Sequence, residues 1–127
     1  MATPPPTLKK RRDFLACARA RRWVAPSLIL QARERRGDRE AGVEGIRVGY
    51  TCSKKVGGAV VRNRAKRRLR AAATEVLGPG GRDGWDYVLI GRADSTATLA
   101  FDRLLADLTK ALDRVHAPPR ERKQARA

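Results

Sequence analysis

The segment from Ser53 to Arg70 constrains this chain more than any other, because it carries eight basic residues in eighteen and no acidic one. Apolar residues recur at spacings of three and four from Val61 to Val76, which predicts a helix with one buried face. No acid stands at helical spacing to pair with the cations, as an ordinary solvated helix would provide. Charges this dense repel one another unless a polyanion or solvent neutralises them. The segment therefore predicts a helix that buries one side and presents the other to a polyanion.

The charge of the whole chain is unevenly placed as well. The 127 residues include 29 Lys and Arg against 13 Asp and Glu, a formal net charge of +16. Residues 1–82 hold 21 basic and 6 acidic residues, whereas residues 83–115 hold 4 and 6. A surplus gathered in one part of a chain is typical of a nucleic-acid footprint.

Length and composition exclude several classes of protein. No apolar run approaches the roughly 18–20 residues of a membrane span, and no signal-peptide segment follows the first residues. Cys17 and Cys52 are too few and too far apart for a disulfide framework or a zinc site. We expect a cytoplasmic protein without membrane or small-molecule partners. It is predicted to form one domain at residues 8–116, between a flexible Pro-rich arm at 1–7 and a basic, flexible tail at 117–127.

Helices and strands alternate along the rest of the sequence. The expected order is a helix at 11–20, strands at 27–33 and 46–53, the basic helix, a strand at 85–90 and a helix at 99–115. Residues 34–45 are interpreted as a loop that turns a hairpin, with room for one further strand in the central region. Gly78-Pro79-Gly80-Gly81 is the strongest breaker of the chain and is expected to end the basic helix. This order predicts an α+β sandwich.

The basic segment resembles the signature of bacterial ribonuclease P protein subunits, in which an Arg-Asn-Arg helix follows a Ser-Lys-Lys-hydrophobic-Gly turn. The matching residues are Ser53-Lys54-Lys55-Val56-Gly57 and Arg62-Asn63-Arg64. Leu8-Lys9-Lys10, Asp13-Phe14 and Asp86-Tyr87-Val88-Leu89-Ile90 follow the order of the family, so the resemblance extends over about residues 8–115. It implies an α-β sandwich in which helices pack on an antiparallel or mixed sheet of about four strands. It also implies a left-handed β-α-β crossover through the Arg-Asn-Arg helix, against the usual rule for such connections.

The resemblance also implies a function. Family members bind the catalytic RNA of ribonuclease P and the 5′ leader of precursor tRNA, and the RNA carries out the hydrolysis with Mg²⁺. We therefore expect no catalytic side chain and no metal ligand in this protein, with Mg²⁺ held mainly by the RNA subunit and the substrate. The single histidine, His116, is interpreted as a residue favoured by the dipole at a helix C-terminus rather than as a general base.

The surface for the RNA subunit is assigned to the basic helix and the turn before it. Its cations would contact phosphates, and Asn63 would hydrogen-bond to RNA or stabilise the helix locally. The residues assigned to this surface are Lys54, Lys55, Arg62, Asn63, Arg64, Lys66, Arg67, Arg68 and Arg70. In Gly58 the chain departs from an asparagine that is common in the family.

The family also implies a cleft between the first helix and the sheet that accepts the single-stranded leader. The residues assigned to it are Phe14, Val48, Tyr50, Lys9 and Arg12. The alternative for Phe14 and Tyr50 is core packing, and Trp23 is left open between capping the core and contributing to the cleft. Ala18 and Ala32 stand where the family often has bulky cleft residues, which predicts weaker stacking of the leader.

Three other functions compete with this interpretation. A structural RNA-binding protein of ribosomal type shares the basicity, size and fold class, and only the signature at 54–67 speaks against it. A protein nuclease would need an acid/base pair or a metal cluster that the sequence lacks. A helix-turn-helix DNA-binding module fits poorly, because the basic helix follows a strand rather than a partner helix.

Overall fold

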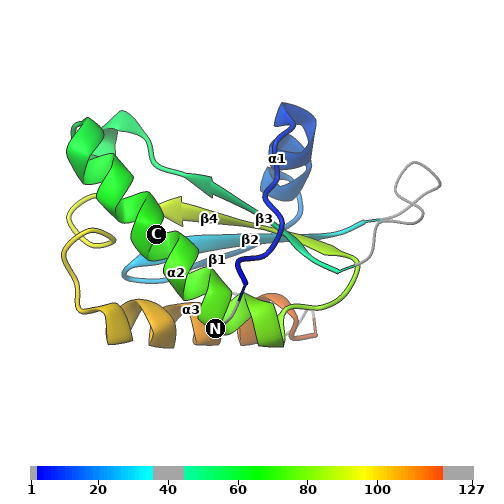
Figure 1. The fold of residues 1–127 in the computed structure, drawn as a ribbon. Coiled ribbons are helices and arrows are strands. Elements are labelled where there is room, and N and C mark those ends of the chain that lie inside the picture. The colour runs from blue at the N-terminus through cyan, green and yellow to red at the C-terminus, as the bar shows by residue number, and fades with distance from the viewer. Residues whose placement is uncertain (1–2, 36–44, 119–127) are drawn as a thin grey trace.

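The structure is a computed structural model, and it describes residues 3–35 and 45–118. Three helices pack on the two faces of one four-stranded sheet, with α1 on one face and α2 and α3 on the other (Figure 1). The helices are α1 (Arg11–Ala18), α2 (Ala59–Gly80) and α3 (Phe101–Val115), and a 3₁₀ turn, η2 (Lys54–Val56), precedes α2. The strands are β1 (Arg21–Val24), β2 (Leu28–Glu34), β3 (Arg47–Thr51) and β4 (Trp85–Gly91), in the order β1-β2-β4-β3. The predicted α+β sandwich is confirmed.

The predicted hairpin between β2 and β3 is wrong, because β4 lies between these two strands. Leu89 of β4 stands opposite Leu30 of β2 in antiparallel register and opposite Tyr50 of β3 in parallel register. Six of the seven residues of β4 are buried, and a strand that is apolar on both sides is stabilised in the centre of a sheet rather than at its edge. Residues 36–44 of the connection lie outside the described residues.

A strand that the sequence analysis did not predict, β1, pairs with β2 in a hairpin. The turn contains Pro26, and the amide of Ala25 donates to the carbonyl of Leu28 at 2.9 Å. Two of the four residues of β1, Arg21 and Arg22, are cations, which hides the apolar alternation of the strand in the sequence. Short, charged strands of this kind are typical of sheet edges, where they discourage pairing with other chains.

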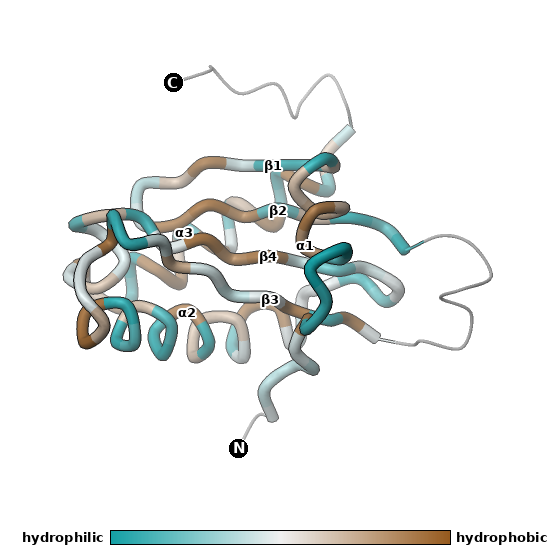
Figure 2. The backbone as a smooth tube through the Cα atoms, turned by 90° about the horizontal axis from the view of Figure 1, so that it is seen from above, coloured by the Kyte–Doolittle hydropathy of each residue, from teal (hydrophilic) through white to brown (hydrophobic). Residues whose placement is uncertain are grey.

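The crossover from β3 through α2 to β4 joins two parallel neighbours. When the sheet is viewed with α2 behind it and both strands pointing upward, β4 lies to the right of β3 (Figures 1 and 2). This arrangement is the left-handed crossover that the resemblance implies.

The end of α2 differs from the expectation, because the helix continues through Pro79 to Gly80. A proline so near the end removes only one hydrogen bond of the helix, to the carbonyl of Glu75, which is an exposed residue. The amide of Gly81 closes the last turn on the carbonyl of Leu77 at 2.8 Å.

The main hydrophobic core lies between the sheet and the pair α2 and α3. Tyr87 is its largest fully buried side chain, and leucines from the sheet and both helices surround it. A smaller cluster on the other face joins Leu8, Cys17 and Val88 beneath α1. In Figure 2 the middle of each central strand is brown, whereas hydrophilic residues gather on α1 and along α2. No helix among the described residues is long and apolar enough to cross a membrane.

A buried ion cluster fixes the sheet beneath α1. The carboxylate of Asp86 is fully buried and accepts hydrogen bonds from Arg33 at 2.9 Å, Arg35 at 2.7 Å and Arg47 at 2.7 Å. Asp13 of α1 lies 3.8 Å from the guanidinium groups of Arg33 and Arg47. The cluster therefore connects α1 to three strands or strand ends through charge.

His116 follows α3 directly and packs on the other face of the sheet, against the aromatic residues Trp85 and Tyr87. Its Nε2 lies 2.6 Å from the hydroxyl of Tyr87, and its ring packs edge-on against Trp85. Burial and, to a lesser extent, the nearby charges of Arg82 and Arg21 together lower the pKa of His116 to about 4. His116 thus lies at the end of α3 as expected, but its side chain is neutral at pH 7, so its ring contacts rather than the helix dipole account for its place there.

Candidate nucleic-acid interface

The turn before α2 is shaped by glycine. Gly57 has φ +148°, and a Cβ at this position would lie 2.9 Å from the side chain of Val61. Gly58 then begins the helix without a side-chain cap and without an acid in the first turn. The unpaired amides and the dipole at this end favour anions, and the exposed Lys54 and Lys55 stand immediately before it.

The face of α2 turned away from the sheet carries the cations that the sequence analysis assigned to it. Asn63, Arg64, Arg67 and Arg70 are exposed, and Arg62, Lys66 and Arg68 are half-buried. Of the predicted apolar stripe, Ala65, Leu69 and Ala72 are buried and Val76 is half-buried. Val61 departs from the prediction, since it lies in the first turn beyond the core and is exposed.

Arg68 differs from its neighbours in where its guanidinium group points. Nε donates to the carbonyl of Thr96 at 2.9 Å, and Nη2 donates to the carbonyl of Leu99. Its guanidinium carbon also lies 6.0 Å from the ring centre of Phe101. The side chain therefore joins α2 to the loop between β4 and α3.

Phe14 lies on α1 and therefore packs on the face of the sheet opposite to α2. Its ring lies over Gly49, where a Cβ would come within 2.4 Å of the ring, so the close approach requires glycine. The ring is half-buried against the small cluster beneath α1. Lys9 and Arg12 are exposed beside it. This segment combines a partly accessible aromatic ring with exposed cations close to it in sequence.

Val48 and Tyr50 do not share that face, and their assignment to one cleft with Phe14 is corrected. Side chains alternate along a strand, so Gly49 of β3 faces α1 while its two neighbours face α2. Val48 is fully buried in the main core. Tyr50 packs at the edge of the same core, with the guanidinium group of Arg70 5.3 Å from its ring centre.

Two further residues of the predicted cleft are placed by the structure. Ala32 is fully buried in the main core and does not line the face beneath α1, whereas Ala18 is exposed at the end of α1. Trp23 packs against the main core with Arg114 above its ring, so it caps the core.

The sequence analysis missed the residues that continue the face beside Phe14. Ile29 of β2 and Ile90 of β4 stand opposite each other in the register and are both half-buried. They lie on the same side of the sheet as Val88, beneath α1. The signal that identifies them is the register of β2 on β4, which alternation within a single strand does not provide.

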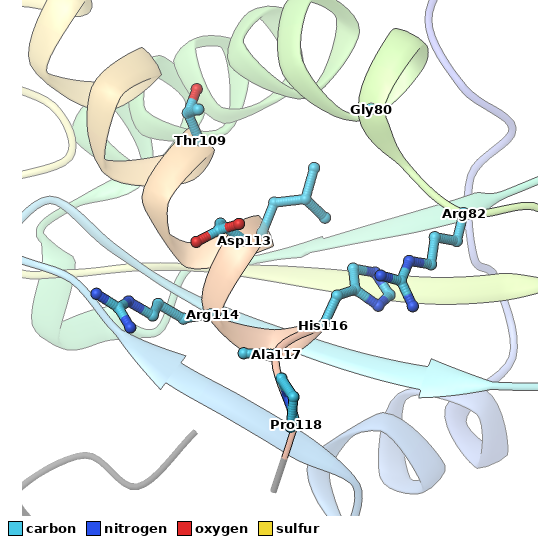
Figure 3. A pocket seen from close by; sticks show the side chains of 9 residues that line it. Gly80, Arg82, Thr109, Asp113, Arg114, His116, Ala117 and Pro118 are labelled. Carbon is cyan, nitrogen blue, oxygen red and sulfur yellow. The ribbon is translucent and has the colours of Figure 1, made fainter. Parts of the chain in front are cut away.

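No group of three or more His, Cys, Asp or Glu side chains that could hold a metal ion occurs among the described residues. A pocket of about 450 Å³ lies between the C-terminal ends of α2 and α3, far along α2 from the basic turn (Figure 3). Arg82, Arg114 and Asp113 contribute charges of both signs to its lining. The pocket contains no residue of the basic face or of the face beneath α1.

Comparison with known proteins links this geometry to one family. Residues 4–116 match the family model for ribonuclease P. The ribonuclease P protein component of Ruegeria pomeroyi is 63% identical over 112 residues, which cover 87% of this chain and 86% of that protein. The corresponding protein of Paramagnetospirillum magneticum is 49% identical over 118 residues, covering 92% and 87%.

Solved structures of similar shape agree. The ribonuclease P protein of Thermotoga maritima has a TM-score of 0.70 at 24% identity and covers 87% of this chain and 98% of that chain. The Staphylococcus aureus protein has a TM-score of 0.68 at 21% identity, with coverage of 87% and 94%. At these identities the structural similarity establishes the fold.

Proposed function

The chain belongs to the ribonuclease P protein family, and from that premise we propose how its two faces serve the enzyme. It is the protein subunit of ribonuclease P, the bacterial ribonucleoprotein that removes the 5′ leader of precursor tRNA. The protein is an accessory subunit, and the RNA subunit carries the catalysis.

The face of α2 binds phosphates of the RNA subunit. The observation that carries this proposal is the absence of any acid from Ser53 to Thr74, while cations line the exposed side of the helix. The residues in this role are Lys54, Lys55, Arg62, Asn63, Arg64, Lys66, Arg67 and Arg70. Each phosphate contact releases condensed counterions, so binding weakens steeply as salt rises.

The face beneath α1 binds the single-stranded leader of precursor tRNA. Phe14 offers a ring for base stacking, Ile29 and Ile90 extend the apolar surface, and Lys9 and Arg12 attract the backbone. Aromatic stacking is worth about 1–3 kcal/mol per base in comparable sites. Since α1 and α2 lie on opposite faces of the sheet, the subunit contacts the two RNAs from different sides (Figure 1).

Mg²⁺ is held by the RNA subunit and the substrate rather than by this chain. The donor groups support this division, because the carboxylate of Asp86 is occupied by arginines and no cluster of metal-ligating side chains occurs in residues 3–35 and 45–118. The holoenzyme works in the cytoplasm, where tRNA precursors are made.

Replacing Phe14 by alanine is expected to lower the affinity of the holoenzyme for precursor tRNA about fivefold or more, with the affinity for mature tRNA unchanged. A stacking ring discriminates only when a leader is present. Equilibrium binding of both tRNAs by reconstituted holoenzyme measures the ratio, and circular dichroism checks the fold. Leu15→Ala is the matched control, because Leu15 is an exposed residue of the same helix.

Phe14→Leu keeps most of the apolar volume over Gly49 and removes the aromatic face, so it tests stacking if the alanine variant fails to fold. A folded Phe14 variant that binds both tRNAs as the wild type does would show that Phe14 is a core residue.

The ribosomal-type alternative has a test of its own. If the wild-type protein associates equally well with unrelated structured RNAs, and does not alter leader removal, that alternative would be supported.

A further inference from the structure

The basic half of α2 is weakly held by hydrophobic burial. The main core takes Leu69, Ala72, Ala73 and Leu77 from this helix. N-terminal to Leu69 the only buried residue of α2 is Ala65, which packs in a separate small cluster with Val56 and Ala97. Small side chains bury little area and leave rotation of the helix end poorly restrained. Directional contacts must therefore help to fix the face that carries Arg64 and Arg67.

Arg68 makes such a contact. Its Nε and Nη2 groups donate to two backbone carbonyls, those of Thr96 and Leu99, in the loop between β4 and α3. A guanidinium group presents two donors on one rigid edge, which suits a pair of fixed acceptors. A lysine ammonium group lacks this fork.

The loop that receives Arg68 is itself firmly anchored. Thr96 is fully buried, and its hydroxyl donates to the carbonyl of Ser27 at 2.6 Å and accepts from the amide of Arg92 at 2.8 Å. The amide and hydroxyl of Ser27 donate to Asp107 of α3 at 3.1 and 2.7 Å. The loop thus connects the β1–β2 turn and α3 to the point where Arg68 arrives.

We propose that Arg68 is a positioning residue for the RNA interface: it orients the basic half of α2 against the 92–99 loop and does not itself bind phosphate. If Arg68 turned to RNA, it would leave two carbonyls of a half-buried loop without their charged donor, which costs more than a surface contact returns. This inference rests on the proposed role of α2 in RNA binding. It separates Arg68 from Arg67, its neighbour in sequence, whose side chain is exposed.

The test uses charge-conserving substitutions at both positions. Arg68→Lys and Arg68→Ala are both expected to weaken binding of the RNA subunit about fivefold or more. Lysine keeps the charge, but like alanine it loses the contact with the two carbonyls. Arg67→Lys is expected to bind within about twofold of the wild type, because a point charge serves a phosphate contact. Arg67→Ala should reduce the slope of log K against log salt by about 0.7–0.9.

Amide hydrogen exchange of the free protein supplies a second readout. Residues of the first turns of α2 should exchange faster in Arg68→Lys than in Arg67→Ala, with the exchange of β4 unchanged. Affinities are measured at a temperature well below the midpoint of thermal unfolding of every variant, so that lost stability alone does not change them.

Two results would overturn the proposal. Recovery of RNA affinity in Arg68→Lys would identify Arg68 as a phosphate ligand, and wild-type affinity in both folded Arg68 variants would limit it to stability. If the wild-type salt slope were zero and Arg67→Ala bound normally, the proposed function of α2 would fail instead.

Discussion

Replacing Arg64 and Arg67 together by alanine is expected to weaken binding of the RNA subunit about 25- to 60-fold at 0.1 M salt. Each phosphate contact contributes about 0.7–0.9 to the slope of log K against log salt, so two contacts amount to about 1.4–1.8 decades between 1 M and 0.1 M. The slope itself should fall by about the same amount. Both side chains are exposed on the side of α2 away from Ala65 and Leu69. The free energy of unfolding should therefore stay within about 0.5 kcal/mol per substitution.

Filter binding or fluorescence titration over a series of salt concentrations measures both quantities. The matched control is Arg19→Ala with Arg22→Ala, which removes the same charge from exposed positions directly after α1 and in β1. An equal loss of affinity in both double variants would show that net charge, rather than the face of α2, determines RNA binding. Raising Mg²⁺ should partly restore activity to the Arg64/Arg67 variant by screening repulsion within the RNA.

Asp86→Asn is expected to lower the free energy of unfolding by about 3–5 kcal/mol, because it removes the anion from a buried cluster of arginines. Burial by itself raises the pKa of Asp86, but hydrogen bonds from Arg47, Arg35 and Arg33 outweigh it and hold the pKa below its ordinary value. This contribution is therefore present above the unfolded pKa of about 4 and is lost as pH falls through the lower folded value.

Urea denaturation followed by tryptophan fluorescence measures this change, since Trp85 adjoins Asp86 in β4. Asp113→Asn is the control, because Asp113 is exposed on α3. Asp86→Asn should also flatten the loss of stability in acid. A variant as stable as the wild type would show that the arginines find other partners, and the ion cluster would then not determine the packing of α1 on the sheet.

Periodicity predicted the long elements of this fold well, because each has a buried face that follows from its own sequence. The face of α2 and the apolar run of β4 needed no knowledge of the rest of the chain. The order of the strands needed more: β4 between β2 and β3 depends on which strand is buried on both sides. The strand β1 was not predicted, because its two arginines mask a pattern that is only four residues long.

The candidate site divides in the same way. Exposed cations such as Arg64 and Arg67 were predictable from helical spacing alone. The direction in which the Arg68 side chain points depends on two carbonyls about thirty residues away in the sequence. The side of the sheet on which Tyr50 lies follows from its neighbour Gly49, which faces α1. When distant backbone groups determine where a side chain points, the local sequence pattern cannot predict that direction. The left-handed crossover was available only from resemblance to the family.

This protein is expected to assist an RNA catalyst by binding RNA rather than by chemistry of its own. Cleavage of precursor tRNA by the cognate RNA subunit, at limiting Mg²⁺ and with or without the protein, tests it directly. We expect the RNA to be nearly inactive alone under these conditions, active with the wild-type protein and weakly active with the Arg64/Arg67 variant, whereas the protein without RNA cleaves nothing. Cleavage by the RNA-free protein, or full activity with the Arg64/Arg67 variant at protein concentrations that limit assembly, would contradict this role.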